Sequence, residues 1–151
     1  MGGGSNMNRI YKDIHVIISA VILVLECLPN GIRLFFFAGP DNSYVMTTSY
    51  FDMVTLGNGD FFPLIAAIVT IVLLVCSIIH IFVKKQVLVR CMMSLYIAAA
   101  VCSVLHILLN GFRAVTVVNG AVVILFAVGI WLLVMENESE YKKETGNLFK
   151  Q

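Results

Sequence analysis

Four long apolar runs occupy most of this chain, and their length constrains the fold more than any other feature. An α-helix rises about 1.5 Å per residue and the hydrocarbon core of a bilayer is about 30 Å thick, so roughly 20 apolar residues cross it. The sequence therefore predicts an all-α integral membrane protein built as an up-and-down bundle of four transmembrane helices. The four spans are placed at about residues 14–37, 63–83, 91–109 and 115–135.

Composition supports this class and leaves room for one domain. Hydrophobic residues make up 60% of the chain and charged residues 13%, whereas soluble domains are about 45–50% apolar and about 25% charged. Residues 1–6, MGGGSN, are interpreted as an added linker ahead of a native start at Met7. The remaining residues, 7–151, are expected to form a single four-helix membrane domain.

Basic residues gather on one side of the predicted spans. Of the ten Lys and Arg, only Arg33 and Arg113 fall on the other side. The positive-inside rule then predicts a multi-pass protein of the cell membrane, with both termini cytoplasmic and a long extracellular loop at residues 34–62. The net charge is +1 and no basic patch is interleaved with aromatic residues, so a nucleic-acid partner is not expected.

The outer ends of the first and third spans match each other. Residues 26–33, ECLPNGIR, align with residues 106–113, HILLNGFR, so that Asn30 corresponds to Asn110 and both segments end in Arg. This match predicts two repeated helical hairpins, related by an axis along the membrane normal. The alternative is that Asn-Gly recurs only because it terminates helices and forms turns.

Glu26 is the residue that a membrane span tolerates least. An acid inside a span costs several kcal/mol unless it is paired, protonated or hydrated, and such groups are candidates for function. His106, Arg33 and Arg113 are the expected partners, and the alternative is that this network only holds the helices together. The predicted polar intramembrane site consists of Glu26, Asn30, Arg33, His106, Asn110 and Arg113.

Small residues in the third span predict which way His106 points. Ser94, Ala98 and Cys102 recur every four residues and continue to His106, and such a stripe lets two helices approach closely. His106 is therefore expected to face the bundle. Two further histidines, His15 and His80, are expected to donate to neighbouring carbonyl groups.

The long outer loop is rich in aromatic residues. Aromatic rings favour the membrane interface, so this segment is interpreted as an interfacial belt, with a ligand-binding or partner-binding surface as the alternative. Residues 44–52 favour a short β-hairpin lid over the bundle, entered by a turn at residues 39–42. Pro29 is expected to kink the first span.

The sequence carries no signature of catalysis. Metal ligands at i and i+4, Cys-x-x-Cys, a nucleophile elbow and a phosphate-binding loop are all missing from it, so no metal, cofactor or catalytic residue is predicted. We therefore expect a non-enzymatic protein, a homo-oligomeric channel or small transporter with its polar site at the outer mouth, in contact with membrane lipids. The alternatives are a scaffold that binds an extracellular partner through residues 34–62, and a lipid-facing enzyme that uses Glu26 and His106 as acid and base.

Overall fold

The computed structural model describes residues 3–37, 43–53, 60–83 and 85–148. These residues form four helices, a two-stranded antiparallel sheet and one 3-10 turn. In chain order the elements are α1 (Gly3–Glu26), β1 (Ile32–Phe37), β2 (Ser43–Thr48), α3 (Phe62–Phe82), α4 (Gln86–Asn110), η1 (Phe112–Ala114) and α5 (Val117–Leu148).

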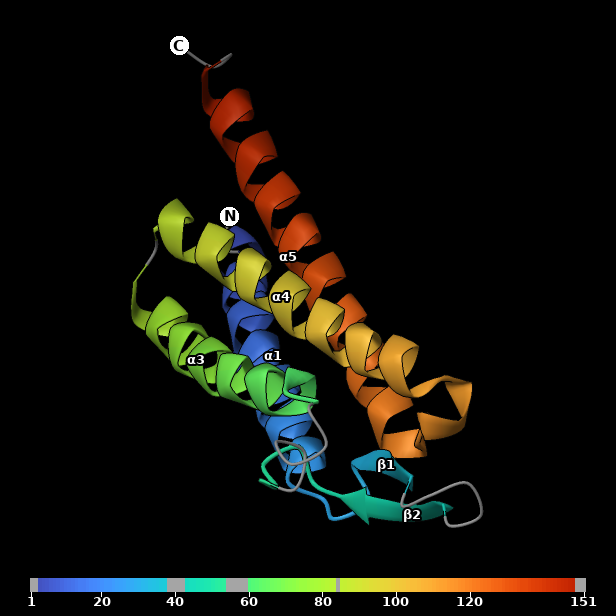
Figure 1. Cartoon of the computed structure of the whole chain (residues 1–151). Helices are drawn as coiled ribbons and strands as arrows, with labels where there is room; N and C mark the ends of the chain where they lie inside the picture. Colours follow the sequence, from blue (N-terminus) through green and yellow to red (C-terminus); the bar gives the residue numbers. More distant parts are fainter. Residues whose placement is uncertain (1–2, 38–42, 54–59, 84, 149–151) are drawn as a thin grey trace.

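The helices form one bundle that the β-hairpin closes at one end (Figure 1). Helices α1 and α4 each pack against both α3 and α5. The two chain ends and the α3–α4 connection lie at one end of the bundle, here called the terminal end. The β-hairpin and η1 lie at the opposite end, here called the hairpin end.

Three helices are long and apolar enough to cross a membrane: α3, α4 and the Val117–Glu138 part of α5. They overlap the predicted spans at 63–83, 91–109 and 115–135 and support the prediction of a membrane protein. Helix α1 is as long, but Arg9, Lys12, Asp13 and Glu26 interrupt its apolar sequence. Helix α5 also continues past its apolar part, through the tail to Leu148.

The predicted first span at 14–37 is wrong in its second half. Helix α1 ends at Glu26, three residues before Pro29, because proline has no N–H group to donate and disfavours helix at the residue before it. The aromatic residues that follow form β1, which pairs with β2 from Ile32 opposite Thr48 to Phe37 opposite Ser43. A β-hairpin does form, but its first strand comes from the segment expected to be helical. The predicted turn at 39–42 lies outside the described residues.

The β-hairpin is attached to the bundle by side chains and by backbone bonds. Ile32 and Leu34 are fully buried, whereas Arg33 between them is exposed, as expected for a strand with one face on a core. Thr116 Oγ1 donates to the Gly31 carbonyl oxygen at 2.7 Å. This sheet therefore covers the hairpin end rather than extending a membrane span.

Close packing between α4 and α5 depends on Gly129. A Cβ atom at this position would lie 2.4 Å from Cε1 of Tyr96. We expect Gly129→Ala to lower the free energy of unfolding by about 1–3 kcal/mol through overpacking. Gly120→Ala on the same helix is the matched control, because its Cβ would meet no atom within 4 Å and gains up to about 1 kcal/mol of helix propensity. Equal unfolding temperatures for the two variants in detergent would contradict this packing.

Candidate functional site

The inward faces of the helices carry polar side chains at two levels, with an apolar layer between them. The terminal cluster, nearer the chain ends, consists of Lys12, His15, Ser19, Ser77, His80, Tyr96 and Glu136. The apolar layer consists of Ile22, Leu73, Ala99 and Phe126. The hairpin cluster consists of Glu26, Tyr50, Asp60, Thr70, Ser103, His106 and Asn119. All of these residues are buried.

Glu26, the last residue of α1, is an acid held almost without partners. Thr70 Oγ1 donates to Glu26 Oε1 at 3.0 Å, while Oε2 is buried without a partner. No Lys or Arg in the described part of the chain forms an ion pair with it. Thr70 Oγ1 is also 3.0 Å from the Ala66 carbonyl oxygen, and a hydroxyl has a single proton. The Thr70 hydroxyl proton is therefore shared between the Glu26 carboxyl group and the Ala66 carbonyl oxygen.

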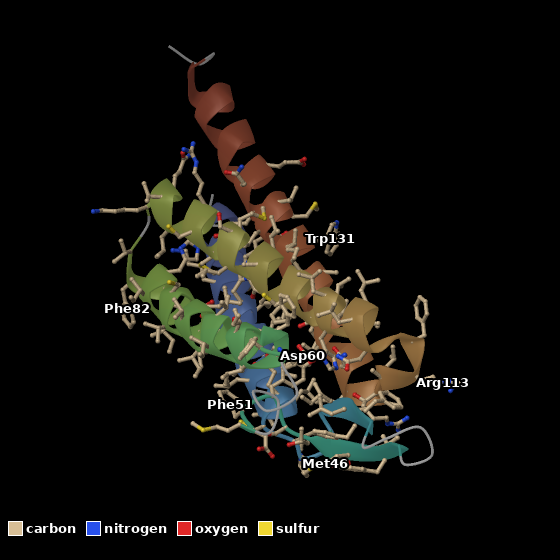
Figure 2. All side chains as sticks on the ribbon, viewed as in Figure 1. Met46, Phe51, Asp60, Phe82, Arg113 and Trp131 are labelled. Atoms are coloured by element: carbon tan, nitrogen blue, oxygen red, sulfur yellow. The ribbon has the colours of Figure 1, made fainter. Side chains whose placement is uncertain are left out.

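The carboxylate partner of His106 is Asp60, not Glu26. Oδ2 of Asp60 lies 2.5 Å from His106 Nδ1 and accepts from Asn110 Nδ2 at 2.6 Å. Its Oδ1 accepts from the Phe62 backbone N–H at 3.2 Å, in the first turn of α3. Asp60 lies on the outer loop as expected, just before α3, but its side chain is turned inward against α4 (Figure 2). The other ring nitrogen, His106 Nε2, is buried without a partner.

Tyr50 brings a side chain from the outer loop into the bundle. Its hydroxyl donates to Asn119 Oδ1 at 2.7 Å, and its backbone N–H donates to the Glu26 carbonyl oxygen at 3.0 Å. The side chain is fully buried, and this burial raises the pKa of Tyr50, so the phenol is a neutral donor. The prediction that the loop aromatics form only an interfacial belt misses this residue.

The terminal cluster is centred on Glu136 of α5. Oε1 of Glu136 lies 3.1 Å from His80 Nε2, and Oε2 lies 3.6 Å from His15 Nε2. Lys12 Nζ donates to the His80 carbonyl oxygen at 2.7 Å. The two histidines were expected to donate to neighbouring carbonyl groups, but both rings lie beside the Glu136 carboxylate instead. The spacing of residues along α1 could have indicated that His15 is buried, since it lies on the same face of the helix as Ile22 and Glu26.

Hydroxyl groups extend this cluster toward the apolar layer. Ser19 Oγ is 3.3 Å from both Ser77 Oγ and Tyr96 OH, and it donates to the His15 carbonyl oxygen at 2.8 Å. Each of these hydroxyls can both donate and accept. The cluster therefore contains groups able to pass a proton from Glu136 to the level of Ser19.

Of the six predicted site residues, Glu26 and His106 are buried, and Asn110 is half-buried at the edge of the same region. The other three, Asn30, Arg33 and Arg113, are exposed at the hairpin end. Within the described residues no direct hydrogen bond joins Glu26 to His106. Thr70 is the partner of Glu26 Oε1, and Asp60 is the partner of His106 Nδ1.

The prediction that the small-residue stripe of the third span faces another helix is wrong. Ser94 and Ala98 are exposed, and the buried face of α4 instead runs through Tyr96, Ala99 and Ser103 to His106. A strict four-residue spacing drifts around the helix, so positions twelve apart differ by about 120° in direction. His106 faces inward as expected, but for a different reason.

The two segments proposed as an internal repeat adopt different conformations. Helix α1 ends at Glu26, whereas α4 continues four residues past His106 to Asn110. Gly111 then leaves the helix with a φ of 75°, a conformation that favours glycine. The duplication remains a prediction.

The buried polar side chains of this interior are of kinds that can exchange protons. Among the described residues, no group of three His, Cys, Asp or Glu is placed to hold a metal ion. Carboxyl, imidazole and hydroxyl groups instead face one another, with unpaired atoms on Glu26, Ser103, His106 and Asn119. Comparisons with protein-family models, curated proteins and solved structures found no match.

Proposed function

We propose that this protein is a small membrane transporter that conducts protons through the interior of its helical bundle. The observation that carries the proposal is Glu26, a buried acid with one hydroxyl partner and no cation beside it among the described residues. Intramembrane acids of this kind mark proton relays and ion pathways, because the neutral form is tolerated in a membrane and the ionised form is not.

The bundle supplies groups on both sides of Glu26 along its axis. Thr70 lies eight residues into α3, so the Glu26 carboxyl group is about 12 Å from the start of that helix. The His106–Asp60 pair lies between it and the hairpin end, and the terminal cluster lies beyond the apolar layer. A proton needs only a chain of donors and acceptors, so a path through one bundle does not require an open pore.

The apolar layer is the barrier in this proposal. Ile22, Leu73 and Phe126 are fully buried between the two clusters. Seven residues separate Ser19 from Glu26 on α1, or about 10 Å, which is too far for direct proton transfer. Protons would cross when water enters this layer, so the layer limits the rate and keeps ions larger than a proton out.

In the proposed transporter α1 is the fourth membrane span, and both chain termini are cytoplasmic. Helix α1 lies beside α3 and α5 in the same bundle, and we treat its apolar residues as a membrane span. The excess of Lys and Arg toward the terminal end supports cytoplasmic termini in the cell membrane. The hairpin end then faces outward. A path inside one bundle does not need the predicted homo-oligomer, which remains a prediction for size measurement in detergent.

Glu136 gives a test with a matched control. Glu136 is buried in the terminal cluster, whereas Glu138 two residues later is exposed. In liposomes loaded with a pH-sensitive dye and driven by a valinomycin-clamped potassium gradient, Glu136→Gln is expected to lower proton flux by about tenfold or more, because the carboxyl group that exchanges the proton is lost. Glu138→Gln is expected to leave the flux unchanged. Equal fluxes for the two variants would argue against a path through this cluster.

One observation favours a second candidate, a lipid-facing membrane enzyme. Asp60 contacts Nδ1 of His106, and Nε2 of the same ring has no partner. In enzymes that use histidine as a general base, a carboxylate at one ring nitrogen orients the ring and the other nitrogen accepts the proton. The two candidates differ at Glu136, which lies at the other end of the bundle. An enzyme built on His106 would keep its activity in Glu136→Gln, whereas a proton path would not.

A further inference from the structure

A groove opens at the hairpin end, between the β-hairpin and the end of α4. It has a volume of about 850 Å³. Its walls combine apolar side chains with polar groups, among them Asn110 and the positively charged Arg113. Its lining includes Phe35, Val45, Leu108, Leu109, Phe112 and Arg113.

The strand register brings a second arginine to the same place. Arg33 is paired with Thr47, and Phe35 two residues later is paired with Val45. Side chains two residues apart on a strand share a face, so Arg33 lies on the face whose Phe35 and Val45 line the groove. β1 also contacts η1, which carries Arg113. Arg113 therefore lines the groove, and Arg33 lies on the strand face that carries two of its lining residues.

The apolar wall of this groove is largely uncovered. Leu108 is 65% exposed, Leu109 66% and Phe112 86%. Arg113 points away from the bundle beside them (Figure 2). Acyl chains cover apolar side chains of this kind in a membrane, while the guanidinium group of arginine matches a phosphate with two parallel hydrogen bonds.

We propose that this groove is a binding site for an anionic phospholipid. The lipid phosphate lies between Arg33 and Arg113, and an acyl chain lies along Leu108, Leu109 and Phe112. Among the described residues that line the groove, Arg113 is charged and none is acidic, so the charge of this lining is complementary to a negatively charged headgroup. The proposal concerns the surface of the hairpin end and does not depend on proton conduction.

Native mass spectrometry in detergent tests the site by counting bound lipids during titration with phosphatidylglycerol or phosphatidylcholine. The wild type is expected to bind phosphatidylglycerol about tenfold more tightly, through two charge-assisted contacts. The double variant Arg33→Gln with Arg113→Gln is expected to lose this preference. The control is Lys85→Gln with Arg90→Gln, which also removes two exposed charges, but at the terminal end.

Two results would overturn the proposal. One is an equal loss of preference in the control pair, which would mean that the net charge of the protein and not this groove selects the lipid. The other is retention of the preference in the Arg33/Arg113 variant. Glycerol phosphate, which has the headgroup charge without acyl chains, is expected not to displace bound phosphatidylglycerol. Full displacement would assign the site to a soluble phosphate compound instead.

Discussion

Replacing Asp60 with alanine is expected to lower the free energy of unfolding by about 3–5 kcal/mol, the largest loss that we predict for a single side chain. The carboxylate serves three partners at once: the ring of His106, the amide of Asn110 and the backbone N–H of Phe62. Its removal leaves a buried imidazole without its partner and the first turn of α3 without its side-chain acceptor.

A double-mutant cycle measures the pairing directly. Asp60→Ala, His106→Ala and the double variant are unfolded by SDS titration in mixed micelles. The double variant is expected to lose at least about 1 kcal/mol less than the sum of the single losses. Asp13→Asn is the control, because Asp13 is exposed on α1, and its effect should stay within about 0.5 kcal/mol. Additive losses at Asp60 and His106 would mean that the two side chains do not stabilise each other.

The helices after residue 60 could be predicted from the sequence because the length of an apolar run is enough to indicate a membrane-spanning helix. A run of about 20 apolar residues in a membrane must satisfy its backbone polar groups internally, and a helix does so. The predicted spans at 63–83 and 115–135 therefore begin within two residues of α3 and α5. The first run failed because hydropathy does not separate helix from strand. Ile32–Phe37 is as apolar as a span, but it pairs with β2 beyond the Pro29 break.

The residues of the interior site could be predicted only where the burial of a side chain depends on its position along a single helix. Glu26 and His106 are buried as expected, although the buried face of α4 that carries His106 is not the small-residue face from which its direction was predicted. Asp60 and Tyr50 are buried because the outer loop folds back over the bundle, and no local pattern separates them from Asp52, which is half-buried, or Tyr44, which is exposed. Glu136 joins His15 and His80 only after three helices assemble. Pairings of this kind depend on tertiary packing, which the spacing of residues along one helix does not contain.

The Glu26 carboxyl group is where proton conduction through the bundle can be tested most directly. Glu26→Gln keeps the size of the side chain and its hydrogen bond with Thr70 but removes the exchangeable carboxyl proton. Its fold can be checked by the unfolding titration used for Asp60, with Asp13→Asn again as the control on the same helix.

The decisive measurement is proton flux into dye-loaded liposomes that contain wild type, Glu26→Gln or Asp13→Asn at equal protein density. The account predicts flux well above that of protein-free liposomes for the wild type and for Asp13→Asn, and flux equal to that of protein-free liposomes for Glu26→Gln. Wild-type flux from folded Glu26→Gln, or a wild type no faster than protein-free liposomes, would contradict proton conduction through this bundle.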